Sequence, residues 1–390
     1  MKIGTPAAGP ISNLLIPKDL GKNNFDLLRF LLAASVIYSH CFVLLYIKMK
    51  DVEPLRLVTQ NQVDFGGIAV SFFFVISGFL IVRSFHHNPA FYNYFVKRIL
   101  RIFPGFIAAF LASVFIIGLL GTGDAAHRWG HWRSYLHSLK LKRIAWQLAT
   151  LEAPRGARTF ASNPLPDMIN ESLWTIQYEF LCYVVVPLLG VAGMMKRRWI
   201  ALLCFLIAYI VLALQTFNIV TFYGYDNIWN WVLPYPSEVP RFIAYFFAGT
   251  CVYLYRHSLV RNRQVAFLSV ALLCVTAQWA PFVKLALPLA GVYLLFYVAY
   301  HPRAPFHRFA ARGDFSYGLY LYGWPVQQLV VYLFAARLTA HQLFFTAFPI
   351  TLLLAYGSWH LVEKRFLKMK HLLQNKKEVR VKPMQPIVES

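Results

Sequence analysis

Long apolar runs separated by short polar segments repeat along this chain from residue 25 to residue 362. An α-helix needs about 20 mostly apolar residues to cross a bilayer. Ten runs reach or approach that length, namely 25–46, 65–83, 102–120, 173–193, 199–215, 240–255, 264–280, 283–300, 315–336 and 343–362. The pattern therefore predicts an all-α, polytopic membrane protein with about ten transmembrane helices.

The composition supports this class. Hydrophobic residues make up 58% of the 390 residues, and charged residues only 14%. A soluble domain of this size could not bury so much apolar surface. The net charge of +22 could suggest nucleic-acid binding, but the basic residues are scattered between the spans instead of gathered on one domain. We therefore expect no nucleic-acid partner.

The basic residues also predict the orientation, because cytoplasmic loops of membrane proteins are enriched in Lys and Arg. Most of them fall on one side when both termini are placed in the cytoplasm. The expected organisation is a cytoplasmic segment 1–24, a transmembrane domain 25–366 and a basic cytoplasmic tail 367–390. The long loop 121–172 would lie outside and carry an amphipathic helix on the membrane surface.

A second outer loop, 216–239, is rich in aromatic residues and contains Asp226 and Glu238. Tyr and Trp rings gather at membrane interfaces, so anchoring explains them. Stacking on carbohydrate is the alternative, and the sequence leaves both open.

The first run carries three ionisable residues, Asp26, Arg29 and His40. A helix turns about 100° per residue, so the eleven residues from Arg29 to His40 return to nearly the same face after a rise of about 16 Å. Asp26, one turn before Arg29, could pair with it. Ionisable groups inside a membrane are costly and mark functional sites. A phosphate-binding Arg29 and a proton-transferring His40 are one interpretation, and a packing network is the other.

The segment YFVKRILRIFPG (94–105) places Lys97, Arg98 and Arg101 together. Arg98 and Arg101 are three residues apart and share a helical face, and Pro104 is expected to bend or restart the helix. The cluster is either a cytoplasmic topology anchor or a clamp for phosphates.

Two further features lie within apolar runs. Glu179 stands about six residues into the run that begins at 173, where a carboxylate must be paired across helices or serve a function. The dipeptide Ser77-Gly78 interrupts an aromatic stretch and predicts close helix packing.

Together these segments resemble the acyltransferase-3 family of bacterial inner-membrane proteins, which acylate cell-surface sugars and related acceptors. The matching pieces are Arg29 with His40, SFFFVISGFLI (71–81), KRILRIFPG (97–105), ESLWTIQYEFLCY (171–183), SYGLYLYGWPV (316–326) and HLVEKRF (360–366). They occur in the family's order and cover nearly the whole span region.

The resemblance implies roles for individual residues. His40 matches the histidine regarded as catalytic, while Arg29, Arg98 and Arg101 match positions associated with donor binding. Glu179, taken as a second catalytic candidate, and Glu363 match acidic positions. Many members carry a histidine where this chain has Gly323, so nothing assigned to that histidine transfers to this chain.

The expected function is membrane-embedded transfer of an acyl group, most simply acetyl, from cytoplasmic acyl-CoA to a hydroxyl of a cell-surface saccharide or lipid-linked glycan. Acyl-CoA is then a donor substrate, and no bound cofactor is expected. No metal is expected either, because no ligand set with metal-site spacing occurs. The expected location is the bacterial inner membrane, among its lipids. The alternative is a transporter or flippase of a polyprenyl-linked saccharide.

Overall fold

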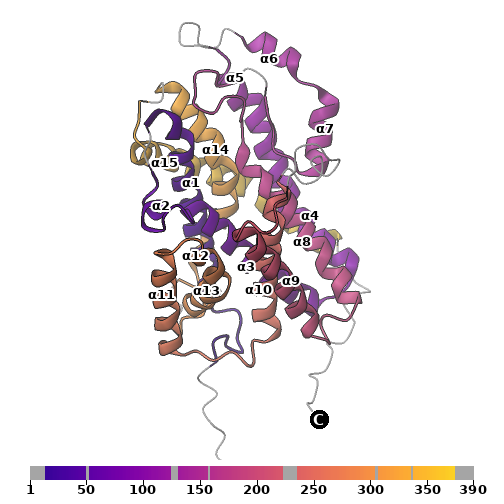
Figure 1. Cartoon of the computed structure of the whole chain (residues 1–390). Helices are drawn as coiled ribbons and strands as arrows, with labels where there is room; N and C mark the ends of the chain where they lie inside the picture. Colours follow the sequence, from indigo (N-terminus) through magenta and orange to yellow (C-terminus); the bar gives the residue numbers. More distant parts are fainter. Residues whose placement is uncertain are drawn as a thin grey trace, which may run out of the picture.

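The computed structural model is a bundle of helices (Figure 1). It describes residues 14–49, 52–123, 131–156, 159–222, 235–303, 306–334 and 337–373. The longer helices of the bundle are α1 (Phe25–Met49), α3 (Phe65–His87), α4 (Phe91–Ala112), α8 (Trp174–Val191), α9 (Trp199–Thr216), α10 (Val239–Leu254), α11 (Arg263–Ala277), α14 (Ser316–Leu333) and α15 (Ala340–Ser358). Within the described residues no β-strand is present, which confirms the all-α class.

Shorter helical pieces extend or connect these helices. Up to residue 238 they are α2 (Pro54–Val58), η2 (Ser113–Ile117), α5 (Gly118–Leu120), α6 (Trp132–Ser138), α7 (Leu141–Thr150), η3 (Glu171–Leu173) and η5 (Pro236–Glu238). Later in the chain they are α12 (Phe282–Ala286), η6 (Leu287–Gly291), α13 (Val292–Ala299), η7 (Phe309–Arg312), η8 (Trp359–Glu363) and α16 (Lys364–Leu373).

Within the described residues, seven helical segments are long and apolar enough to cross a membrane. They are Phe25–Leu45, Phe65–His87, Phe91–Leu120, Glu171–Val191, Trp199–Thr216, Phe282–Ala299 and Ala340–Lys370. The predicted count of ten is not confirmed. The other three runs are helices as well, but α10 has only 16 residues and α11 only 15, while α14 carries the fully buried amides Gln327 and Gln328.

Helix α4 differs from its prediction. It begins at Phe91 instead of near residue 102, and it continues through Pro104 without a break in the assigned helix. Arg98 and Arg101 therefore lie well inside a long helix, not in a turn between helices. This placement allows their side chains to reach the interior of the bundle.

Helix α3 packs closely against α10. A Cβ atom on Gly78 would lie 2.0 Å from the carbonyl oxygen of Phe246, so only glycine permits this approach. Ring contacts also join α3 to α1, with the centroids of Phe25 and Phe79 separated by 5.7 Å. Aromatic pairs of this kind add about 0.5–1.5 kcal/mol beyond the area that they bury.

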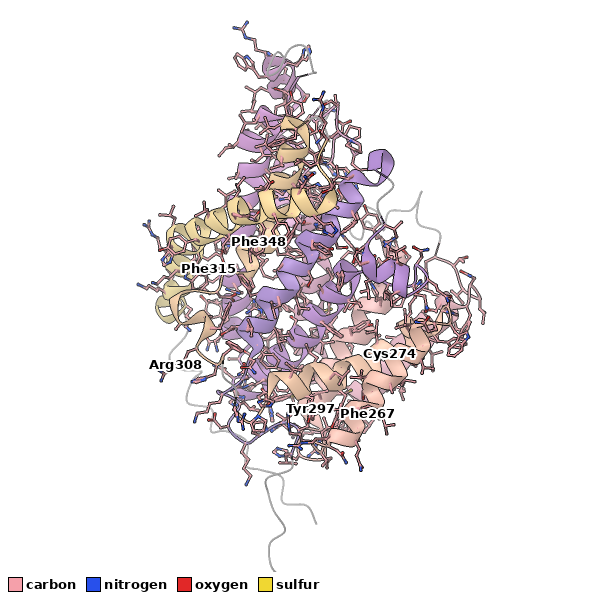
Figure 2. The ribbon with its side chains drawn as sticks, turned by 90° about the vertical axis from the view of Figure 1, so that its left-hand side faces the viewer. Phe267, Cys274, Tyr297, Arg308, Phe315 and Phe348 are labelled. Carbon is pink, nitrogen blue, oxygen red and sulfur yellow. The ribbon has the colours of Figure 1, made fainter. Side chains whose placement is uncertain are left out.

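The outer surface of the bundle is apolar. Phe267, on the rim of α11 in Figure 2, is 72% exposed, and Leu353 on α15 is 73% exposed. Soluble monomers rarely show such extended apolar surfaces, whereas lipid chains accommodate them. With the seven candidate spans, this surface shows an integral membrane protein.

The long loop between α5 and α8 contains two short helices, α6 and α7, beyond the end of α4 (Figure 1). The segment that follows α7 is anchored to the bundle by buried amides. Asn163 Nδ2 donates to Gln328 Oε1 at 2.7 Å, and Asn170 Nδ2 donates to the carbonyl of Leu321 at 2.9 Å. The loop thus covers one end of α14.

Candidate functional site

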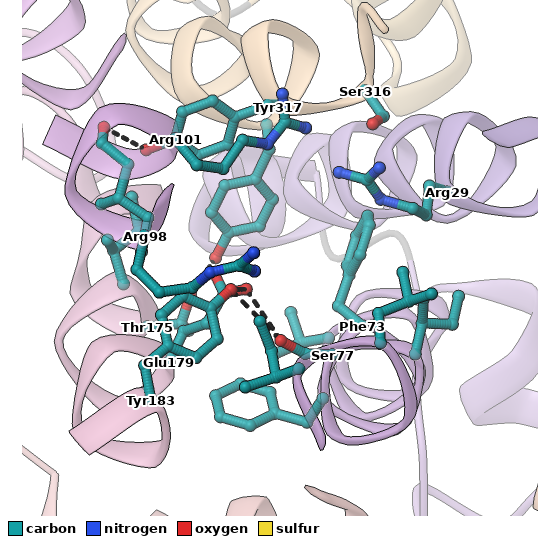
Figure 3. Close-up of a pocket in the computed structure, with 18 residues that line it drawn as sticks. Arg29, Phe73, Ser77, Arg98, Arg101, Thr175, Glu179, Tyr183, Ser316 and Tyr317 are labelled. Carbon is teal, nitrogen blue, oxygen red and sulfur yellow. Dashed lines mark hydrogen bonds between the residues drawn. The ribbon is translucent and has the colours of Figure 1, made fainter. Parts of the chain in front are cut away.

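A cavity of about 150 Å³ lies between five helices of the bundle. Its walls come from α1, α3, α4, α8 and α14, and Figure 3 shows their side chains converging. The lining combines apolar side chains with charged and hydroxyl-bearing ones, which are Arg29, Ser77, Arg98, Arg101, Thr175, Glu179, Tyr183, Ser316, Tyr317 and Tyr320. We call it the arginine cavity. It brings together four of the five residues singled out in the sequence.

A carboxylate that the sequence did not single out joins two of these arginines. Asp314 Oδ2 lies 2.8 Å from Arg29 Nη1 and 2.5 Å from Arg101 Nη2. Arg29 therefore pairs with Asp314 and not, as the sequence suggested, with Asp26. Glu363 is 2% exposed, accepts a hydrogen bond from Ser358 Oγ and lies 4.0 Å from Arg101. The network fixes both guanidinium groups at one end of the cavity.

Arg98 is held differently. Its guanidinium carbon lies 5.9 Å from the ring centroid of Tyr94 and 5.8 Å from that of Tyr183, within the range of cation–π attraction. Its Nε is buried and has no hydrogen-bond partner. Figure 3 shows the guanidinium pointing into the cavity, toward Glu179. Arg98 is thus a cation with an unsatisfied donor facing the enclosed space.

Glu179 is hydrogen-bonded across helices. Ser77 Oγ on α3 donates to Glu179 Oε1 at 3.2 Å, and the hydroxyl of Tyr183 donates to the same oxygen. The expectation of close packing at Ser77-Gly78 therefore applies to Gly78, while Ser77 serves as a polar partner. Glu179 therefore places a hydrogen-bonded carboxyl group in the cavity wall.

His40 does not line this cavity. Its ring packs edge-on against Trp324 of α14, with centroids 4.9 Å apart, and its Nδ1 is buried without a hydrogen-bond partner. Arg29 reaches Asp314, just ahead of α14, so both side chains of α1 face α14. The last residue of α14 that lines the cavity, Tyr320, is one helical turn before Trp324. His40 therefore lies about one turn, or 6 Å, beyond the cavity along α14.

Gly323 lies where helices α1 and α14 approach closely. A Cβ atom at this position would lie 2.8 Å from Cγ1 of Ile37 on α1. Gln327 Nε2, one turn later, donates to the backbone carbonyl of Ile37 at 2.7 Å. In this chain α1 occupies the space that a larger side chain at position 323 would need.

Ser39, the residue before His40 on α1, belongs to a polar cluster. Ser39 Oγ donates to Glu53 Oε2 at 2.7 Å, and the backbone N–H of Phe65 donates to Glu53 Oε1 at 2.5 Å. Glu53 is only 2% exposed, and burial raises its pKa although both hydrogen bonds oppose the shift. The cluster ties α1 to the start of α3 beside His40.

The sequence reasoning missed Asp314, Ser77 as a polar partner, and the hydroxyl groups of Thr175 and Tyr320, which hydrogen-bond to each other. The acidic residue directly ahead of the SYGLYLYGWPV motif was the available signal for Asp314. In the described part of the chain no group of three His, Cys, Asp or Glu side chains could hold a metal ion. Most aromatic residues of the loop 216–239 lie in 223–234, outside the described residues.

Comparison with known proteins agrees with the resemblance seen in the motifs. The model of a family described as "Acyltransferase domain" matches residues 22–360. The chain is 28% identical over 349 residues to an O-acetyl transferase of Shigella phage Sf6, covering 88% of this chain and 96% of that protein. It is 27% identical over 376 residues to nodulation protein 10 of Rhizobium leguminosarum bv. viciae, covering 90% and 94%. No solved structure matches.

A helical membrane bundle with a buried arginine cavity and a family match over most of its length defines a membrane-embedded enzyme. The chain belongs to the acyltransferase-3 family and is an acyltransferase.

Proposed function

We propose that this enzyme is an O-acyltransferase of the bacterial inner membrane. It moves an acyl group, in the simplest case acetyl, from cytoplasmic acyl-CoA to a hydroxyl of a cell-surface saccharide or lipid-linked glycan. The observation that carries the proposal is the arginine cavity, which holds three guanidinium groups and ends about one helical turn short of His40. The phage relative named O-acetyl transferase supports the reaction class.

The donor would bind through its phosphates. Guanidinium groups suit phosphate oxygens because they donate two parallel hydrogen bonds. Arg98 has an unsatisfied buried donor, whereas Arg29 and Arg101 share Asp314 and stay oriented. The pantetheine arm would then extend along α1, where Arg29 and His40 are separated by about 16 Å.

The chemical step needs a base near the thioester. The hydroxyl oxygen of the acceptor attacks the thioester carbon, the C–S bond breaks, and coenzyme A leaves as a thiolate that takes up the proton released by the hydroxyl. His40 would accept the proton of the hydroxyl as a general base, or receive the acyl group itself before passing it on. Its Nδ1 has no competing protein partner. Glu179, inside the cavity, is the second candidate for a catalytic role.

A transporter of a lipid-linked saccharide would also have many spans and buried charges. Membership of an acyltransferase family favours the enzyme. The distinguishing experiment uses purified protein in proteoliposomes with radiolabelled acetyl-CoA. We expect acyl exchange between acetyl-CoA and free coenzyme A, or transfer to an added glycan, and expect His40→Asn to abolish both. Glycan translocation without any consumption of the thioester would contradict the proposal.

A further inference from the structure

A second cavity, of about 260 Å³, lies next to the arginine cavity along α3. It is enclosed by the start of α3, the end of α9, the start of α10 and helix α12. Its polar lining consists of Gln62, Asp64, Ser71, Gln215, Thr216, Ser237, Glu238, Arg241, Tyr245 and Lys284. We call it the polar cavity. Nothing in the mechanism above uses it.

The polar cavity lies at the level of His40. Ser39, the neighbour of His40 on α1, has its side chain about 3 Å from the position that a Cβ on Gly66 would take. Gly67, the next residue of α3, lines the polar cavity. From Gly67 to Ser77, which lines the arginine cavity, α3 rises about 15 Å. The two linings meet on α3 at Val70 and Ser71 and extend from there in opposite directions along the helix, with His40 close to the level of the second.

The chemistry of the lining differs from that of the arginine cavity. Arg241 pairs with Glu238 and Asp64 pairs with Arg56, while the remaining polar groups besides Lys284 are amides and hydroxyls. Such a wall offers both hydrogen-bond donors and acceptors. A phosphate, with acceptors alone and a double charge, would match it poorly. A ligand with many hydroxyl groups, each of which donates and accepts, would match it well.

Two cations retain binding capacity toward the cavity. Arg241 Nη2 lies 2.6 Å from Glu238 Oε2, but its Nε is buried and has no hydrogen-bond partner. Lys284 is exposed and forms no ion pair with a described carboxylate. A buried donor without a partner costs about 1–3 kcal/mol, and a ligand oxygen in the cavity would remove that cost.

An aromatic wall connects this arginine to the arginine cavity. The guanidinium of Arg241 lies 4.9 Å from the ring centroid of Phe242. Phe242 stacks on Phe74 with centroids 4.3 Å apart and planes inclined by 5°. Phe74 lines the arginine cavity. A group bound at Arg241 is thus separated from the donor's cavity by two stacked rings.

From these observations we propose that the polar cavity is the acceptor site and binds a saccharide unit, with Arg241 and Lys284 as substrate-binding residues. This inference rests on the proposed function, since it places the hydroxyl-bearing substrate of that reaction. The sugar would enter from the side opposite to the arginines and present a hydroxyl at the level of His40.

The test measures the two substrates separately in proteoliposomes, with acetyl-CoA as donor. Two acceptor preparations are used: cell-surface polysaccharide from cells lacking this gene, after alkaline deacylation, and the lipid-extractable glycans of the same cells. Arg241→Gln and Lys284→Gln should raise the KM for whichever preparation is acetylated, by about 10–100-fold for Arg241, the loss of a charged hydrogen bond. The KM for acetyl-CoA should stay within about twofold.

Arg263→Gln is the matched control, because Arg263 is exposed and lines neither cavity. Lys284→Gln removes no ion pair, so it remains informative if Arg241→Gln fails to fold. If the wild-type enzyme acetylates a preparation and both variants keep its KM unchanged, the inference is overturned while the function stands. If the wild-type enzyme acetylates neither preparation, the proposed function and the inference are overturned together.

A binding readout independent of turnover completes the design. Ser237 lines the polar cavity and is exposed. In a cysteine-free background, Ser237→Cys should react with an impermeant thiol reagent, and the acetylated preparation should slow that reaction. Labelling that is indifferent to saturating glycan would overturn the assignment.

Discussion

The arginine cavity and the polar cavity differ in how their charges are arranged. In the first, three guanidinium groups share the wall with one carboxyl group, several hydroxyl groups and apolar side chains, and the carboxylate of Asp314 holds two of the guanidinium groups in place. In the second, cations and carboxylates alternate with amides and hydroxyls. One wall suits a concentrated negative charge and the other a dispersed set of hydroxyl groups. Under the assignments proposed above, the two substrates would be separated by charge pattern before any chemistry takes place.

The largest effect is expected in a test of which side of the membrane each loop occupies, because an introduced cysteine should be labelled either fully or not at all. Ser162 lies exposed in the loop that covers the end of α14, and Ser258 lies exposed beyond the end of α10. In a background lacking the five native cysteines, Ser162→Cys should react with an impermeant thiol reagent in intact cells. Ser258→Cys should react only after the membrane is opened. The reverse pattern would exchange the sides of the two cavities.

The next effect concerns His40, which lies beyond the arginine cavity along α14 and near the level of the polar cavity. His40→Ala should leave a folded, membrane-inserted protein whose acyl transfer is reduced about 10²–10⁴-fold, the usual cost of losing a general base. His40→Asn preserves most of the volume and should be equally inactive. Transfer rates in vesicles test this prediction. Near-normal transfer by the alanine variant would show that His40 is not needed for acyl transfer.

A third test concerns the network around Asp314. Asp314→Asn leaves Arg29 and Arg101 without their shared charge, and breaking a buried ion pair typically costs about 3–5 kcal/mol. We expect a clear fall in thermal stability in detergent, together with a raised KM for acetyl-CoA. Adding Arg101→Gln to this variant restores the charge balance and should recover part of the stability. Equal stability of all three proteins would mean that the network does not hold the arginine cavity.

The smallest effect separates donor binding from topology. Arg98→Ala should raise the KM for acetyl-CoA by about tenfold, because a hydrogen bond to a charged group contributes about 1.5–3 kcal/mol. The KM for the glycan should hardly change. Lys97→Ala is the control, since Lys97 precedes Arg98 on α4 and lines neither cavity. If both variants behave alike, Arg98 serves only as a topology anchor.

The sequence predicted the parts of the site that local spacing determines. Arg98 and Arg101, three residues apart on one helix, do line the same cavity, and Arg29 joins them. Contacts between distant segments could not be predicted in the same way. The partner of Arg29 is 285 residues away in the chain, and spacing rules reach only about one helical turn. Asp26 was a reasonable local choice that tertiary packing overrode.

The polar cavity illustrates a second limit. Each of its residues resembles an ordinary residue at a helix end, where polar groups are common. Only the arrangement of four helix ends shows that Gln215, Arg241 and Lys284 share one space. The predicted span boundaries failed for a related reason. Helix α4 begins at Phe91, because basic residues that hydropathy assigns to a loop are tolerated where they face a polar interior.

The distance in sequence between Arg29 and Asp314 also bears on how the protein is made. At about 5–20 residues per second, the ribosome needs on the order of 15–60 s to add the 285 residues that separate them. During that time the guanidinium groups of α1 and α4 lack their shared carboxylate, at a cost in hydrocarbon. We therefore expect the early helices to remain loosely assembled until the C-terminal helices insert. In a pulse-chase experiment, a chain that stops at Gly313 should be degraded by membrane proteases faster than the full-length chain.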